Sequence, residues 1–246
     1  MKHAIKTSQQ LLLCLALAAA SSASAAVEHA IGFARDIQTG NLRYIEHHQW
    51  PGDGSHRIDY YTPDRSPLAF KAMTFPALPQ HPDIQQADFS RNISAQARSV
   101  VDGIRITSQK DNEENSYLLT GDPDLVLDAG FDAWIKDNWT SLLDQGERRL
   151  RFAIVGVERT LAMNLRATPT AEGLVINITP ANWFVSLLVP KMVLQYDQSR
   201  RITAFEGYSN LVPRKGEGKI LVINYQHYQT ADPLTRPLSA WLATAD

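Results

Sequence analysis

The chain has 246 residues, of which 44% are hydrophobic, and a formal net charge of −2 at pH 7. Because the charge is small and dispersed, the sequence lacks the electrostatic footprint of a nucleic-acid-binding protein. The one cysteine, Cys14, lies in a segment that we expect to be removed. The rest of the chain then has no disulfide, no thiolate metal site and no cysteine nucleophile.

The first 25 residues have the pattern of a secretory signal peptide. The first ten carry Lys2 and Lys6 and no acid, the next ten are all apolar, and Ala23-Ser24-Ala25 fits an A-x-A cleavage site. Ten apolar residues are too few to span a bilayer core of about 30 Å, which argues against the alternative of an uncleaved anchor. We therefore expect a cleaved signal peptide and a periplasmic or secreted protein whose residues 26–246 form a single β-rich domain.

The segment between this leader and residue 120 has the pattern of strands and turns. Runs of alternating or β-branched and aromatic residues, separated by Gly- and Pro-containing clusters, predict strands at 32–37, 41–50, 56–61, 68–75, 87–92 and 98–109. A short apolar segment at 117–120 then leads toward the helix. Three prolines make residues 76–83 an irregular crossing loop. The polar residues 110–115 are expected to form an exposed loop.

Residues 130–146 form the one long helical pattern of the chain. Large apolar side chains fall on one half of the helical wheel: Phe131, Trp134, Ile135, Trp139, Leu142 and Leu143. Gly130 is expected as the N-cap, and Gly146 as the left-handed residue that ends the helix. A helix of about 15 residues is marginal alone, so this one is expected to lie on a sheet.

Strand patterns return after the helix and continue to residue 227. Clean alternation predicts strands at 149–154, 161–166, 174–178, 191–197, 201–208 and 219–227, and the apolar residues 181–189 are expected to cover the sheet together with the helix. With roughly ten strands and no βαβ rhythm, the fold class is mainly β. We expect a curved antiparallel sheet or open half barrel, with one amphipathic helix at about 131–145 on its concave face.

This order of elements resembles that of the periplasmic lipoprotein carriers and related half-barrel lipid binders of the bacterial envelope. The resemblance is one of architecture, and no sequence motif carries it. It implies a half barrel that encloses an apolar ligand. It assigns no role to any particular residue.

A first candidate site lies in the hairpin formed by residues 41–61. If residues 51–55 form its loop, His48 pairs with Ile58, and Glu46, His48 and His56 share one face with several aromatic side chains. A carboxylate and two imidazoles can hold a divalent ion or act as acid and base. Alternatively, the face is exposed, or its polar groups pair with one another. A four-residue loop would change the pairing altogether.

A second candidate site is an apolar ligand pocket beneath the central helix. Its expected lining is Phe131, Trp134, Ile135, Asn138, Leu142 and Trp183. Asn138 lies near the middle of the apolar face, where it would either contact a ligand or satisfy a sheet carbonyl. Trp183 would belong to a lid, to a membrane-touching loop or to ordinary core. A solid core beneath the helix would contradict this hypothesis.

These patterns leave three functional hypotheses. The first is a secreted, non-enzymatic protein that binds a hydrophobic or lipid-like molecule without a cofactor. The second is a metal-dependent or acid/base enzyme that uses Glu46, His48 and His56. The third is a structural or assembly factor of the cell envelope, with peripheral envelope contact. The sequence contains no G-x-S-x-G, P-loop, H-E-x-x-H or dinucleotide-binding motif.

Overall fold

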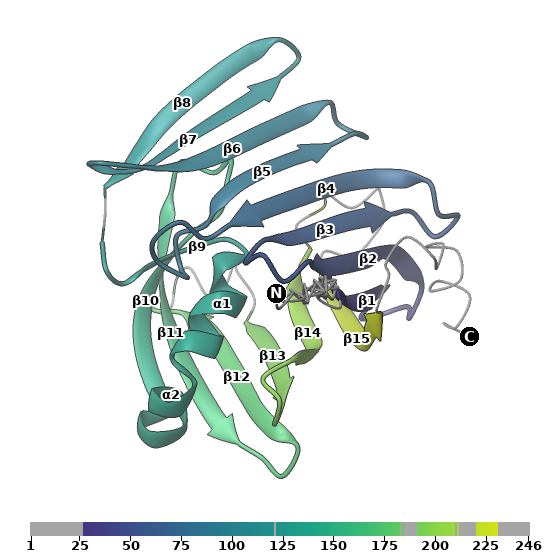
Figure 1. Ribbon diagram of the computed structural model, residues 1–246, viewed down its shortest axis with the longest axis vertical. Coiled ribbons are helices and arrows are strands. Elements are labelled where there is room, and N and C mark those ends of the chain that lie inside the picture. Colours follow the sequence, from purple (N-terminus) through teal and green to yellow (C-terminus); the bar gives the residue numbers. More distant parts are fainter. Residues whose placement is uncertain are drawn as a thin grey trace, which may run out of the picture.

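The computed structural model describes residues 27–120, 122–182, 184, 191–209, 211 and 220–230. The predicted signal peptide and Trp183 lie outside these residues, as do six of the nine residues of the apolar segment 181–189. Within the described residues, the chain forms one curved sheet and two short helices (Figure 1).

The sheet has fifteen strands, more than the roughly ten predicted. The strands are β1 (Val27–Asp36), β2 (Leu42–Trp50), β3 (His56–Tyr61), β4 (Pro67–Thr74), β5 (Asp83–Asp88), β6 (Ile93–Val100), β7 (Gly103–Lys110), β8 (Glu113–Thr120), β9 (Leu125–Leu127), β10 (Glu147–Ala153), β11 (Thr160–Pro169), β12 (Gly173–Pro180), β13 (Met192–Asp197), β14 (Ile202–Tyr208) and β15 (Ile220–Thr230). The predicted loop at 110–115 is in fact a tight hairpin turn. Asp111 and Asn112 adopt positive φ angles of 49° and 70°, which two-residue hairpin turns require, so β8 begins at once.

The sheet runs in the order β8-β7-β6-β5-β4-β3-β2-β1-β15-β14-β13-β12-β11-β10-β9. All neighbours are antiparallel except β9 and β10, which are parallel. Pairing of β1 with β15 joins the two halves of the sheet along ten register positions. The sheet curls on itself without closing into a barrel, which confirms the predicted curved, mainly β, open architecture (Figure 1).

Strand β9 forms one edge of the sheet, and the proline-rich loop between β4 and β5 covers it. The Leu127 N–H donates to the Gln80 carbonyl at 3.0 Å, and the His81 ring contacts the Leu125 carbonyl at 2.8 Å. These bonds satisfy backbone groups that an edge strand would otherwise leave open. The loop therefore fixes β9, and the helix that follows it, against the β4–β5 part of the sheet.

The predicted single helix is two segments, α1 (Gly130–Asp137) and α2 (Trp139–Gln145), with a break at Asn138. Asn138 has φ −93° and ψ 11°, and its side-chain amide donates to the Trp134 carbonyl at 2.9 Å beside the backbone N–H of the same residue. A side chain that competes for a helical carbonyl disturbs the ladder at that point. Asn138 therefore contacts its own helix rather than a ligand or a sheet carbonyl.

The two glycines at the ends of the helical region are present for different structural reasons. Gly146 has φ 70° and ends α2 in the left-handed conformation, as predicted. Gly130 is not the N-cap, which is Ala129; it is the first helical residue. A Cβ at Gly130 would lie 2.5 Å from Pro82 Cδ, so the glycine is required for close contact with the β4–β5 loop.

The helices pack on the concave side of the sheet, against β10 to β13 (Figure 1). Four side chains of the predicted apolar face are buried: Phe131, Ile135, Trp139 and Leu142. Trp134 is half-buried, and Leu143, which was predicted on the same face, is 40% exposed. None of the described helices is long and apolar enough to cross a membrane.

Candidate functional site

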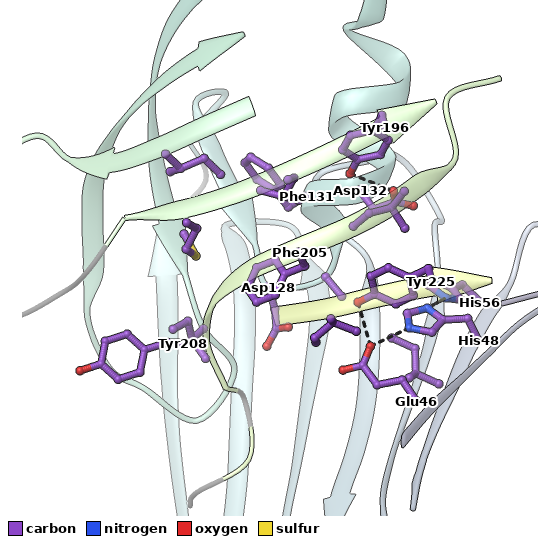
Figure 2. A pocket seen from close by; sticks show the side chains of 18 of the residues that line it. Glu46, His48, His56, Asp128, Phe131, Asp132, Tyr196, Phe205, Tyr208 and Tyr225 are labelled. Carbon is purple, nitrogen blue, oxygen red and sulfur yellow. Dashed lines mark hydrogen bonds and ion pairs between the residues drawn. The ribbon is translucent and has the colours of Figure 1, made fainter. Parts of the chain in front are cut away.

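A cavity of ≈ 190 Å³ lies between the inner face of the sheet and the start of α1 (Figure 2). Residues of β2, β3 and β15 line one wall, and residues of α1, β10, β12, β13 and β14 line the opposite wall. Most of the lining is apolar or aromatic, including Leu150, Phe152, Ile178, Leu194 and Ile223. The cavity is somewhat larger than the roughly 150 Å³ engineered cavity that holds benzene.

The cavity is lined by all three residues of the predicted metal or acid/base site and by one residue of the predicted apolar site. Glu46, His48 and His56 line its sheet wall, and Phe131 lines its helix wall. Ile135 and Leu142 do not line it, because both are fully buried in the packed core between the helices and β10 to β13.

The other residues of the predicted ligand-binding face make no contribution to the lining. Trp134 packs at the side of the same core, and Asn138 bonds within its helix. The predicted cavity beneath the whole helix is therefore wrong: the space is confined to the N-terminal end of α1.

The hairpin register is as predicted for a five-residue loop. Glu46 pairs with Tyr60 and His48 with Ile58, while β3 begins at His56. Alternation then places Glu46 and His48 on the concave face and His47 on the opposite face. Glu46, His48 and His56 are all buried.

Gly32 on β1 allows two polar side chains from non-adjacent strands to meet. It pairs with Glu46 of β2 on one side and with Tyr225 of β15 on the other. Strands are spaced about 4.8 Å apart, so these two residues start roughly 10 Å from each other. A Cβ at Gly32 would lie 2.6 Å from the Tyr225 ring. Its absence lets the ring cross β1 and donate its hydroxyl to Glu46 Oε2 at 2.9 Å.

The polar groups of this wall form a continuous hydrogen-bonded chain (Figure 2). Glu46 Oε2 also lies 2.9 Å from His48 Nε2, and His48 Nδ1 lies 3.1 Å from His56 Nε2. The carboxylate requires the proton of His48 on Nε2, which leaves Nδ1 to accept the His56 Nε2–H. Below, Tyr225, Glu46, His48 and His56 are called the polar chain.

Burial sets the protonation states around the polar chain. Burial raises the pKa of Tyr225 well above its usual range, and the Glu46 charge raises it further. The same two causes raise the pKa of Tyr44, which lies next to Glu46 on the same face of β2. Burial also lowers the pKa of His56 well below 6.5, with further contributions from His48 and two lysines. The two tyrosines therefore remain hydroxyl donors, and His56 remains neutral at neutral pH.

The polar chain does not form the predicted metal site. Both ring nitrogens of His48 are engaged, one with Glu46 and the other with His56. Over the described part of the chain, no three His, Cys, Asp or Glu side chains gather as ligands for a metal ion. The alternative in which the polar groups pair with one another describes the observed geometry.

Trp50 stands at the mouth of the cavity. A surface hollow of ≈ 250 Å³ shares Trp50, His56 and Asp132 with the cavity lining. The Trp50 ring stacks on His56 with centroids 4.5 Å apart, and the Lys136 ammonium lies 5.5 Å from its centroid. Lys136 pairs with Asp132 at 2.8 Å, and Asp132 accepts the Tyr196 hydroxyl at 3.1 Å. These contacts tie α1 to β2 and β13 around the opening.

Sequence reasoning missed Gly32, Tyr225 and the buried ion pair between Lys71 and Asp128. Lys71 lies on β4, and Asp128 lies between β9 and α1 with φ 47°, a left-handed conformation. The signal for Gly32 was present as a glycine inside an apolar strand, which marks close approach of another group. Tyr225 lies 179 residues from Glu46, so no local pattern connects them.

No protein-family model matches the chain, and no curated protein matches it. Among solved structures, the chain is similar to the crystal structure of a beta-barrel-like protein of domain of unknown function DUF1849 from Brucella abortus. The two share a TM-score of 0.54 and 8% identity over 82% of this chain and 98% of that one. The comparison therefore shows a shared beta-barrel-like fold.

Proposed function

We propose that this protein is a secreted, periplasmic binding protein that holds a hydrophobic or lipid-like molecule in the cavity beside α1. The observation that carries the proposal is a mainly apolar cavity whose polar wall is already satisfied by internal hydrogen bonds. Such a wall demands no polar partner from a ligand, so burial of apolar ligand surface provides the binding free energy. The signal-peptide pattern supports secretion.

The acid/base enzyme is the weaker proposal. A general base needs a nitrogen or oxygen within hydrogen-bond reach of the substrate. His48 uses both of its ring nitrogens inside the polar chain. The envelope factor has no specific support, because the exposed large apolar residues of the described chain are spread over several strands and turns, for example Ile37, Phe89, Val101 and Leu118.

The first test is native mass spectrometry of protein purified from the periplasm without detergent, followed by organic extraction. A stoichiometric apolar molecule is the expected result. A bare polypeptide that also fails to bind any apolar probe would contradict the proposal. A bound divalent ion would redirect attention to Glu46, His48 and His56.

The second test uses two isoleucines on the same face of β12. Both are buried, but only Ile178 lines the cavity, whereas Ile176 lies in packed core. We expect Ile178→Phe to fill part of the cavity and weaken binding of an apolar fluorophore about tenfold, with little loss of stability. Ile176→Phe should leave binding intact and cost about 1–3 kcal/mol of unfolding free energy by overpacking. Equal binding by both variants would place the ligand elsewhere.

A further inference from the structure

A second chamber of ≈ 400 Å³ adjoins the cavity on the side away from Trp50. It lies between the inner face of β3 to β7 and the β10–β11 connection, and it shares Tyr60, Asp128, Ile154 and Tyr208 with the first cavity. The cavity beside α1 is called the first chamber below, and these four residues form the waist. Figure 2 shows Asp128 and Tyr208 on the side of the first chamber away from His56.

The two chambers differ in charge. Among the described residues, the carboxyl residues Glu46, Asp128 and Asp132 line the first chamber, and no lysine or arginine does. The same part of the chain gives the second chamber three cationic residues, Lys71, Arg91 and Lys110, against two acidic ones, Asp88 and Asp128. An anionic group is therefore disfavoured in the first chamber and favoured in the second.

Two of the three cations in the second chamber already have carboxylate partners. Lys71 pairs with Asp128, and Arg91 pairs with Asp88 at 2.8 Å. Lys110 is exposed and forms no ion pair with the described residues. The excess positive charge of the second chamber therefore lies at Lys110, on the side formed by the end of β7.

We infer that the ligand is a single-chain amphiphile with an anionic head, whose tail occupies the first chamber and whose chain passes the waist to place the head in the second. This inference rests on the proposed function and specifies its ligand. A methylene group is about the size of a water molecule, whose share of liquid volume is about 30 Å³. The first chamber, at ≈ 190 Å³, therefore holds roughly six methylenes. A longer chain must therefore extend through the waist. The combined volume of the two chambers lies in the range of ordinary ligand pockets, about 300–1,000 Å³.

The test measures binding of saturated carboxylates from six to sixteen carbons by calorimetry below their micelle concentrations. We expect affinity to rise about fourfold per added methylene well beyond eight carbons. A plateau at six to eight carbons would overturn the inference and leave the proposed function intact. Failure of every carboxylate and every matching primary alcohol to bind would overturn both.

A substitution at the waist provides the matched control. Ile154 is 36% exposed and lines both chambers, whereas the neighbouring Glu158 lines neither. Ile154→Trp should abolish the additional affinity that chains of twelve or more carbons have over octanoate, measured as the ratio of the two affinities within the variant. Glu158→Trp, which adds bulk to the same connection outside both chambers, should behave as wild type. Equal long-chain affinity in both variants would overturn the passage through the waist.

The position of the head group is tested by comparing each carboxylate with the alcohol of the same length. Carboxylates should bind more tightly, and Lys110→Gln should reduce that preference about two- to threefold, as for an exposed charge. Lys136→Gln, beside Trp50 at the mouth of the first chamber, should leave the preference for carboxylates over alcohols unchanged. Equal binding of alcohols and acids, or a larger effect at Lys136, would overturn the placement of the head.

Discussion

Two buried polar arrangements are held in different ways: the polar chain in the wall of the first chamber, and the ion pair of Lys71 and Asp128 in the lining of the second. The polar chain on β2, β3 and β15 contains one carboxylate that accepts neutral donors, and each link runs within one wall of the sheet. The ion pair of Lys71 and Asp128 joins β4 to the start of α1, across the concave side. Hydrogen bonds therefore organise one wall, whereas full charges connect two walls. The second arrangement should be far more sensitive to loss of one partner.

The largest expected effect is at the ion pair. Lys71→Met leaves the Asp128 carboxylate buried without its cation, which should cost about 3–5 kcal/mol of unfolding free energy, measured by denaturant titration. Asp128→Asn retains a residue that tolerates positive φ. The double variant Lys71→Met/Asp128→Asn should recover most of the loss. A double variant as unstable as Lys71→Met alone would show that the two charges are not coupled.

The next effect is at the point where the polar chain crosses β1. Gly32→Ala forces the Tyr225 ring away and disrupts its bond to Glu46, for an expected cost of about 1–3 kcal/mol. In a Tyr225→Ala background the same substitution meets no ring but still lies 2.9 Å from Ile223 Cγ2, so its cost should fall without disappearing. Denaturant titration of the four proteins gives the coupling free energy. Equal cost in both backgrounds would assign Gly32 a backbone role unrelated to Tyr225.

The polar chain also shows how far sequence reasoning reaches. The register of Glu46 with Tyr60 was predictable, because it depends on a five-residue loop and on the alternation of side chains. The participation of Tyr225 was not, because it depends on β1 and β15 pairing from opposite ends of the described chain. The role of Gly32 can therefore be predicted only when both of its neighbouring strands, β2 and β15, are known.

The helix gives the same lesson for apolar residues. Its amphipathic pattern predicted a buried face, and Phe131, Ile135 and Leu142 are indeed buried. Which part of that face adjoins empty space depends on how the sheet curls around it. Phe131 lines the cavity, whereas Ile135 and Leu142 contact packed core. Periodicity distinguishes buried from exposed positions but does not distinguish filled space from a cavity.

The smallest expected effect is on how the free energy of unfolding changes with pH. Burial holds the pKa of His56 well below 6.5, and the neighbouring His48, Lys136 and Lys71 lower it further. In the unfolded chain His56 gains a proton as the pH falls through about 6.5, while in the folded protein it remains neutral. Its contribution to stability is therefore complete above that pH and falls below it, by up to 1.4 kcal/mol per pH unit.

His56→Gln retains an N–H donor for His48 and cannot titrate. Unfolding free energies measured from pH 7 to pH 5 should fall less steeply for this variant than for wild type, by the equivalent of one proton. Part of the acid sensitivity should persist in the variant, because burial also lowers the pKa of His47, to about 4. If the two proteins lose stability in parallel, His56 is protonated in the folded state, and the polar chain then includes a cation beside His48 rather than a neutral donor.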